Sequence, residues 1–194
     1  MGSEGAWITE EEFRRLVSAP VIEEREVLQH RGLLHIDRLI AASTYRECPL
    51  LRKAIHTFKY RRIPTLARAL AGLLPHTLPS DAVLCPVPLH WTRRFARGFN
   101  QSALLASELS QGRGLIVRNM LQRIRPTGSQ AKRHRAERLT ALESAFRCVV
   151  PDPPASVVLV DDLSTTGATL DECAKALKAS GVKHVEGWVI AHDR

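Results

Sequence analysis

The sequence predicts an α/β fold with a central, mainly parallel sheet that is flanked by helices. Apolar runs of strand length alternate with segments in which apolar residues recur at helical spacing. The part from residue 157 to residue 191 has the order strand, helix, strand, which is the unit that builds parallel sheets. A length of 194 residues suits one domain, or one domain with a small appendage.

The N-terminal half is expected to hold three helices and one strand. A Thr-Glu-Glu-Glu capping box opens the first helix, and the strand is expected where apolar and β-branched residues mix. Pro64 separates two later segments with helical spacing. The predicted elements are a helix over residues 9–18, a strand within 34–45, a helix from residue 49 and a helix over 66–74.

The C-terminal half is expected to alternate strands with helices. Its clearest strand is a run of four apolar residues, and Gly181 is placed to end the helix that follows. The predicted strands lie at 82–87, within 115–123, and at 145–150, 157–160 and 185–191, and one further helix lies at 100–110. Residues 124–138 are rich in Arg and Lys and poor in bulky apolar side chains, which predicts a mobile loop.

Positive charge is concentrated in the middle of the chain. The protein has a net charge of +8, but residues 45–150 hold nineteen Arg and Lys against five Asp and Glu, a net charge of +14. A segment of this kind suits a polyanion such as nucleic acid, phosphate or pyrophosphate, and a solubilising surface is the alternative explanation.

The remaining composition argues against a membrane or secreted protein. No apolar stretch is long enough to span a membrane, and the acidic N-terminus lacks the apolar core of a secretory signal. The four cysteines form no C-x-x-C pair, so we expect neither disulfides nor a zinc site. These features together predict a cytoplasmic protein.

The stretch Val-Val-Leu-Val-Asp-Asp-Leu-Ser-Thr-Thr-Gly-Ala-Thr-Leu, which begins at Val157, carries the strongest chemical signal. Asp161 and Asp162 follow the buried strand at its carboxyl end, where α/β sheets bind ligands. Hydroxyl residues and Gly167 then lead into a helix N-terminus, whose free N–H groups favour phosphate. Carboxylates accept hydrogen bonds from vicinal sugar hydroxyl groups. The pattern therefore predicts a site for a phosphorylated ribose; an ordinary strand–loop–helix junction is the alternative.

This stretch resembles the phosphoribosyl pyrophosphate (PRPP) signature of type I phosphoribosyltransferases. The resemblance implies a type I phosphoribosyltransferase fold with a small hood and a flexible loop. It implies that Asp161 and Asp162 are the catalytic acids, in contact with the ribose 2′ and 3′ hydroxyl groups. The 5′-phosphate loop would consist of Thr165, Thr166, Gly167, Ala168 and Thr169. Mg²⁺ is expected as the cofactor, bound mainly through PRPP.

Further motifs resemble the ComF family, phosphoribosyltransferase-like proteins that are named for competence for DNA uptake. They are Phe58-Lys59-Tyr60, Pro86-Val87-Pro88-Leu89, Arg97-Gly98-Phe99-Asn100-Gln101, Arg125-Pro126-Thr127 and Arg135-Ala136-Glu137-Arg138. The resemblance covers residues 34–192. ComF proteins usually begin with a cysteine-rich zinc ribbon, but residues 1–44 contain no cysteine. We therefore expect an acidic extension or hood segment over residues 1–44 and a phosphoribosyltransferase domain over residues 45–194.

The resemblance also implies basic contacts to the pyrophosphate group. Their expected residues are Lys59, Arg93, Arg94 and Arg97, since guanidinium groups match phosphate oxygens, and a solvated surface is the alternative for each. The flexible loop is expected to close over PRPP with Arg125, Gln130 and Arg138. Arg133 and Ala141 replace a Leu and an Asn that are common in the family, so the loop contacts are expected to differ. Asn100 and Gln101 either cap the next helix or touch a ligand.

Two functions from different classes follow from these observations. The first is a phosphoribosyltransferase that releases pyrophosphate and transfers phosphoribose to an unknown acceptor, in connection with DNA uptake. The second is a competence accessory protein without turnover that binds single-stranded DNA, and a PRPP-sensing regulator is a weaker third idea. The expected partners are PRPP, single-stranded DNA in the second case, and a second copy of the chain or another competence protein.

Overall fold

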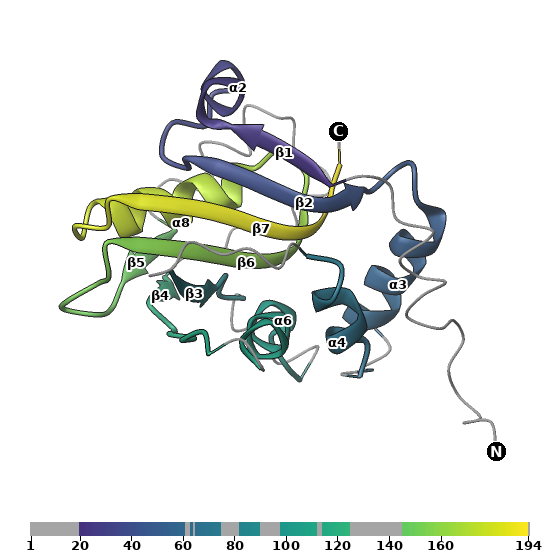
Figure 1. The fold of residues 1–194 in the computed structure, drawn as a ribbon. Helices are drawn as coiled ribbons and strands as arrows, with labels where there is room; N and C mark the ends of the chain where they lie inside the picture. Colours follow the sequence, from purple (N-terminus) through teal and green to yellow (C-terminus); the bar gives the residue numbers. More distant parts are fainter. Residues whose placement is uncertain are drawn as a thin grey trace.

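A five-stranded sheet with the order β1-β2-β7-β6-β3 forms the centre of the fold (Figure 1). Its strands are β1 (Val21–Glu24), β2 (Arg38–Thr44), β3 (Val83–Pro86), β6 (Ser156–Ser164) and β7 (His184–His192). β2, β7, β6 and β3 are parallel, and β1 pairs with β2 in the antiparallel direction. The computed structural model describes residues 20–60, 63, 65–74, 82–89, 98–111, 114–124 and 145–193. The predicted α/β class with a mainly parallel sheet is confirmed.

Helices cover both faces of this sheet. They are α2 (Arg25–His30), α3 (Pro49–Tyr60), α4 (Leu66–Ala71), α6 (Gln101–Ser110) and α8 (Ala168–Lys178), and a hairpin of β4 (Leu121–Arg123) and β5 (Phe146–Cys148) completes the fold. Figure 1 shows α3, α4 and α6 together on one side, away from α8. The expected elements of residues 34–60, 66–74 and 100–110 are therefore confirmed in type and place.

The alternation of side chains along β6 explains why the sheet has two hydrophobic cores. Val158 and Val160 belong to the core under α3, α4 and α6, whereas Val157 and Leu159 belong to the core under α8 and the β4–β5 hairpin. All four side chains are fully buried. Burial of a side chain of this size stabilises the fold by about 1.5–3 kcal/mol. A strand that is buried on both faces is an uninterrupted apolar run, which is why β6 is evident in the sequence.

The sequence predicts no element between Pro20 and the strand at β2, but β1 and α2 lie there. β1 is a short edge strand in which only Glu23 is buried. Glu23 points inward as half of an ion pair with Arg31, so this strand buries a charge where a hydrophobic pattern would show an apolar residue. Inward-pointing charges are a common feature of edge strands. Hydrophobic periodicity therefore could not detect β1.

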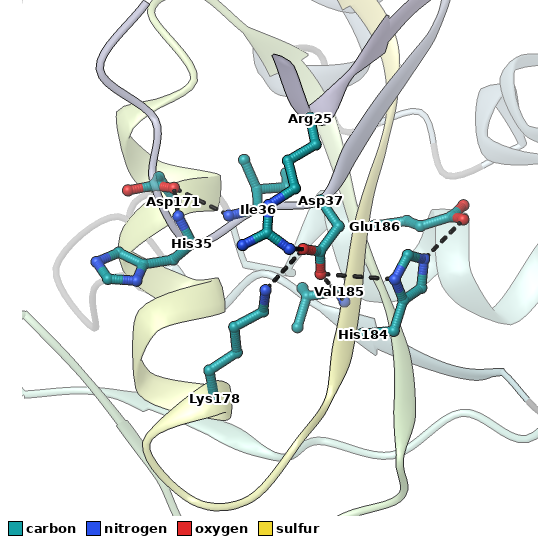
Figure 2. Close-up of polar contacts among 9 residues, drawn as sticks. All are labelled: Arg25, His35, Ile36, Asp37, Asp171, Lys178, His184, Val185 and Glu186. Carbon is teal, nitrogen blue, oxygen red and sulfur yellow. Dashed lines mark hydrogen bonds and ion pairs between the residues drawn. The ribbon is translucent and has the colours of Figure 1, made fainter. Parts of the chain in front are cut away.

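A buried carboxylate fastens the amino edge of the sheet to α8 (Figure 2). Asp37 accepts hydrogen bonds from the backbone N–H of Val185 at 2.9 Å, from Lys178 at 2.7 Å and from Arg25 at 3.0 Å. At the other end of α8, Asp171 accepts from the backbone N–H groups of His35 at 2.7 Å and of Ile36 at 3.0 Å. The segment that leads into β2 is thus bound to both ends of α8.

Some predictions lie outside the described residues. They are the helix over residues 9–18 and the loop over 124–138 beyond Ile124. The boundary expected at residue 44 stays a prediction; β1 and β2, which precede it, belong to the same sheet as β6 and β7. Among the described residues, no helix has the length and apolar character that a membrane crossing needs.

Candidate functional site

The acidic pair lies in the second half of β6, near the carboxyl edge of the parallel sheet. β6 continues to Ser164, four residues beyond the apolar run that predicted it. Asp162 is 5% exposed, and Asp161 is partly buried. The two carboxyl groups contact different helices, α6 and α3, which lie on the same side of the sheet.

Asp161 is held by two hydrogen bonds to one of its oxygen atoms. Its Oδ1 atom accepts from the Ser102 hydroxyl at 2.8 Å and from the backbone N–H of Asp162 at 2.9 Å. Burial and the neighbouring Asp162 carboxylate raise the pKa of Asp161 to about 6, although the two hydrogen bonds and Lys59 oppose that rise. Asp161 is therefore a carboxyl group that changes its charge close to neutral pH.

Asp162 forms an ion pair with α3, which lies on the same side of the sheet as α6. Its Oδ1 atom lies 2.9 Å from the ammonium nitrogen of Lys59, in the last turn of α3. The Lys59 side chain is 17% exposed, so the pair is largely shielded from water. A cation in the last turn of a helix is also favoured by the helix dipole. The structure thus places Lys59 beside the acidic pair, and its expected contact with pyrophosphate stays a prediction.

The predicted phosphate loop joins β6 to the N-terminus of α8, as the sequence analysis expects. Gly167 is the N-cap of α8 and has a φ of +82°, which side chains rarely tolerate. A Cβ atom at this position would lie 2.5 Å from Cδ1 of Leu33, so the close approach also requires glycine. Ala168 begins the helix, and its N–H donates to the Thr166 hydroxyl at 3.4 Å.

The two other threonines of the loop flank this turn. Thr165 is exposed and Thr169 is partly buried. The first N–H groups of an α-helix have no partner within the helix, so the N-terminus of α8 can offer them to an anion. The acids and the loop together occupy nine consecutive residues, 161–169, at one edge of the sheet.

A buried polar junction supports the start of this loop. The carbonyl of Ser164 accepts from the backbone N–H of Asp193 at 2.8 Å and lies 3.0 Å from Nδ1 of the fully buried His192. Nε2 of His192 lies 3.0 Å from Arg31. Within the described part of the chain, the buried hydroxyl of Ser164 has no hydrogen-bond partner. No sequence pattern predicts this junction, because its residues are adjacent only in the folded chain.

The N-terminus of α6 supplies the third element of the site. Asn100 caps this helix, because its side chain accepts from the backbone N–H of Ser102 at 3.2 Å. Its amide nitrogen also donates to the carbonyl of Val87 at 3.1 Å, just beyond β3. Of the two alternatives for Asn100, the structure shows the capping role. Ser102 is the site residue that sequence reasoning missed, although its place two residues after a helix cap was a usable signal.

The thiols near the site are neutral groups. Burial raises the pKa of Cys85 to about 11 and the pKa of Cys173 well above its usual value, and Asp161 contributes to the second shift. In the residues that the structure describes, no group of three or more His, Cys, Asp and Glu side chains could hold a metal ion. The remaining expected site residues lie outside the described ranges; they are Arg93, Arg94, Arg97, Arg125, Gln130 and Arg138.

Comparison with known proteins identifies relatives for most of the chain. It is 32% identical over 168 residues to competence protein F of Haemophilus influenzae, which covers 80% of this chain and 72% of that protein. It is 34% identical over 163 residues to DNA utilization protein YhgH of Salmonella typhi, and this match covers 79% of this chain and 71% of that protein. It is 30% identical over 149 residues to competence protein ComFC of Bacillus subtilis, and this match covers 72% of this chain and 58% of that protein. No protein-family model matches the chain.

These similarities agree with the motifs in the sequence. The matches to competence protein F and to YhgH exceed 30% identity and span more than two thirds of each relative. Similarity of this extent includes the core of the fold and cannot come from one shared motif. The chain therefore belongs to the ComF family.

Proposed function

We propose that this protein is a cytoplasmic phosphoribosyltransferase with a type I phosphoribosyltransferase fold, which binds PRPP together with Mg²⁺. One observation carries the proposal: two buried or partly buried acids at the carboxyl end of β6 are followed directly by a glycine-capped helix N-terminus. Carboxylates suit the ribose hydroxyl groups, and helix N–H groups suit the 5′-phosphate.

In this proposal the C1–oxygen bond to pyrophosphate breaks, and a bond forms between C1 and a nitrogen nucleophile of the acceptor. Pyrophosphate leaves with the bonding electron pair, and the acceptor loses a proton. The transition state resembles an oxocarbenium ion, so positioning and stabilisation of the leaving group supply most of the catalysis. Mg²⁺ would be bound mainly through PRPP, whose oxygen atoms are the hard ligands that this cation prefers, and would offset the negative charge of the leaving pyrophosphate.

Titration calorimetry with PRPP tests the proposal, with and without Mg²⁺. We expect binding by the wild type that strengthens with Mg²⁺ and is lost in the Asp161→Asn/Asp162→Asn double variant. A matched control is Asp152→Asn, because Asp152 is an exposed carboxylate on the surface. Circular dichroism of the double variant separates loss of the site from loss of the fold. A wild-type protein that binds no PRPP at any Mg²⁺ concentration contradicts the proposal.

A second candidate function is binding of single-stranded DNA during DNA uptake. The names of the relatives favour it, since they are a competence protein F and a DNA utilization protein. The net charge of +14 over residues 45–150 supports it as well. This function does not exclude the first, because the acids and the phosphate loop lie in the net-negative C-terminal segment.

The salt dependence of DNA affinity tests the second candidate. A protein that neutralises three or more phosphates of a single strand should lose affinity with a slope of about −2 or steeper in a log–log plot. A dT oligonucleotide, measured by fluorescence anisotropy between low and physiological salt, provides the probe. A weak affinity with a flat salt response would contradict DNA binding and leave the PRPP proposal intact.

A further inference from the structure

Residues on two helices determine how the acidic pair is presented. Ser102 on α6 donates to Asp161, and Lys59 on α3 is paired with Asp162. Ser102 precedes Asp161 by 59 positions in the sequence, and Lys59 precedes Asp162 by 103 positions. Neither residue therefore belongs to the PRPP-like stretch itself. Their roles follow from the contacts that the fold creates.

The Ser102 hydroxyl has a fixed position. Ser102 is 1% exposed, at the second residue of α6, and its backbone is held by the Asn100 cap. Asn100 is in turn bonded to Val87, at the carboxyl end of β3. Both hydrogen bonds that Asp161 accepts in the described part of the chain are made to Oδ1. Oδ2 is therefore the oxygen atom that remains for a ligand.

The Lys59 ammonium group is fixed by the packing of its neighbour. Phe58 is fully buried, and its ring centroid lies 5.9 Å from that of Phe99, one residue before the α6 cap. The end of α3 and the start of α6 are thus packed together. Lys59 faces a carboxylate that is 5% exposed, where an unpaired charge would be costly.

We propose that Ser102 and Lys59 are positioning residues of the acidic pair, with Ser102 setting the orientation and charge of Asp161 and Lys59 setting those of Asp162. The proposal concerns the site that the proposed function assigns to PRPP, and its use in binding rests on that function. Without Ser102, the Asp161 carboxyl group loses a donor that favours its charged form. Without Lys59, Asp162 loses its counter-charge.

The charged and titratable groups around Asp161 are few among the described residues. They are Asp162 on the same strand, Lys59 on α3 and the thiol of Cys173 on α8. The Cys173 thiol remains neutral because burial raises its pKa well above its usual value. α6 contributes the neutral Ser102 hydroxyl. Among the described residues, a change in the titration of Asp161 is therefore expected to come from Ser102, Lys59 or Asp162.

The first experiment follows the carboxyl titration in the protein without ligand, by ¹³C NMR of protein labelled at the Asp side chains. The Asp161→Asn variant assigns the Asp161 signal. We expect its midpoint near pH 6 to rise by about one unit in Ser102→Ala, to return in Ser102→Thr, and to rise less in Lys59→Met. Ser110→Ala and Lys53→Met are matched controls on the same two helices. Equal midpoints in wild type, Ser102→Ala and Lys59→Met would overturn the proposal.

The second experiment measures PRPP affinity of the same variants at pH 6.5 and pH 8.5. Each variant is compared with the wild type at the same pH, because the phosphate groups of PRPP titrate in this range too. In Ser102→Ala we expect about a threefold loss of affinity at pH 6.5 and a smaller loss at pH 8.5, where Asp161 is ionised in both proteins. A loss that is equal at both values would indicate a packing role and overturn the proposal. Because the NMR titration needs no ligand, shifted midpoints without PRPP binding would count against the proposed function alone.

Discussion

The ammonium nitrogen of Lys59 lies 2.9 Å from Oδ1 of Asp162, and this pair joins the end of α3 to the carboxyl end of β6. An ion pair that is this well shielded from water differs from a surface pair, because removal of one partner leaves a buried charge. The pair therefore affects stability as well as the site. Its energetic coupling can be measured directly.

A double-mutant cycle on this pair is expected to show strong coupling. Lys59→Met should lower the free energy of unfolding by about 2–3 kcal/mol at pH 7, because Asp162 is left without a counter-charge. Asp162→Asn in the Lys59→Met background should recover much of this loss. Urea denaturation measures all four proteins, with Lys53→Met as the control. Additive effects of the two substitutions would contradict the pairing.

The raised pKa of Asp161 predicts that this residue destabilises the protein as pH rises. A carboxyl group whose folded pKa is about 6, against an ordinary 3.8, binds more protons in the folded than in the unfolded state between these values. Its contribution to stability is therefore greatest below pH 4 and falls as pH rises to about 6. Asp161→Asn should be more stable than wild type at pH 7 by about 1–2 kcal/mol, a figure reduced for partial exposure, with a smaller difference at pH 4.

Urea denaturation across pH 4 to 8 measures this effect. The difference in unfolding free energy between Asp161→Asn and wild type should grow steadily up to about pH 6 and then level off. A difference that stays constant over the range, or that grows as pH falls, would show that Asp161 titrates normally.

Substitution of Gly167 by alanine should destabilise the protein more than the same substitution at Gly32, which has a similar backbone conformation. Gly32 has a φ of +80° and open space around it, whereas a Cβ at Gly167 would meet Leu33. Gly32→Ala should cost about 1 kcal/mol for the left-handed conformation, and Gly167→Ala should cost at least 1 kcal/mol more. Thermal and urea denaturation of both variants test the difference.

The steric part of this effect can be separated from the conformational part. In a Leu33→Ala background, Gly167→Ala should be less destabilising than in wild type, because the clashing side chain is absent. If Gly167→Ala lowers the free energy of unfolding equally with and without the Leu33 side chain, contact with Leu33 is not the reason for glycine at this position.

Asp37 should be important for stability and unimportant for ligand binding. It lies at the amino edge of the sheet, opposite the acidic pair, with Arg25 and Lys178 as its charged partners (Figure 2). Asp37→Asn should lower the unfolding free energy by about 2–3 kcal/mol, less than for a fully buried pair because Arg25 is exposed. PRPP affinity at a temperature where the variant is folded should match that of wild type. A changed affinity with unchanged stability would contradict this division.

The sequence was most informative where burial is uniform or where chemistry is local. β6 could be predicted because both of its faces are covered by apolar cores, and the acids and Gly167 could be placed because they follow it directly. β1 could not be predicted, because it is a short edge strand whose inward side chain is charged. Side-chain periodicity contains no information about a buried ion pair.

Long-range partners were beyond prediction for a different reason. Ser102 and Lys59 reach the acids only because α6 and α3 pack on the same sheet, and pairings between helices depend on tertiary geometry. Lys59 entered the sequence analysis through a family motif, not through any expectation of its partner. β6 is longer than the apolar run predicts for a similar reason, since the polar residues Asp161 and Ser164 also pair with β7.

The central claim is that one ribose phosphate bridges the acids of β6 and the N-terminus of α8. Backbone amide shifts of ¹⁵N-labelled protein, recorded during titration with PRPP and Mg²⁺, test it most directly. We expect the largest changes at the N–H groups of residues 165–170, and no change at Gly32 or in the segment around Asp37. Saturable changes elsewhere with residues 165–170 unmoved, or no changes at all, would contradict it.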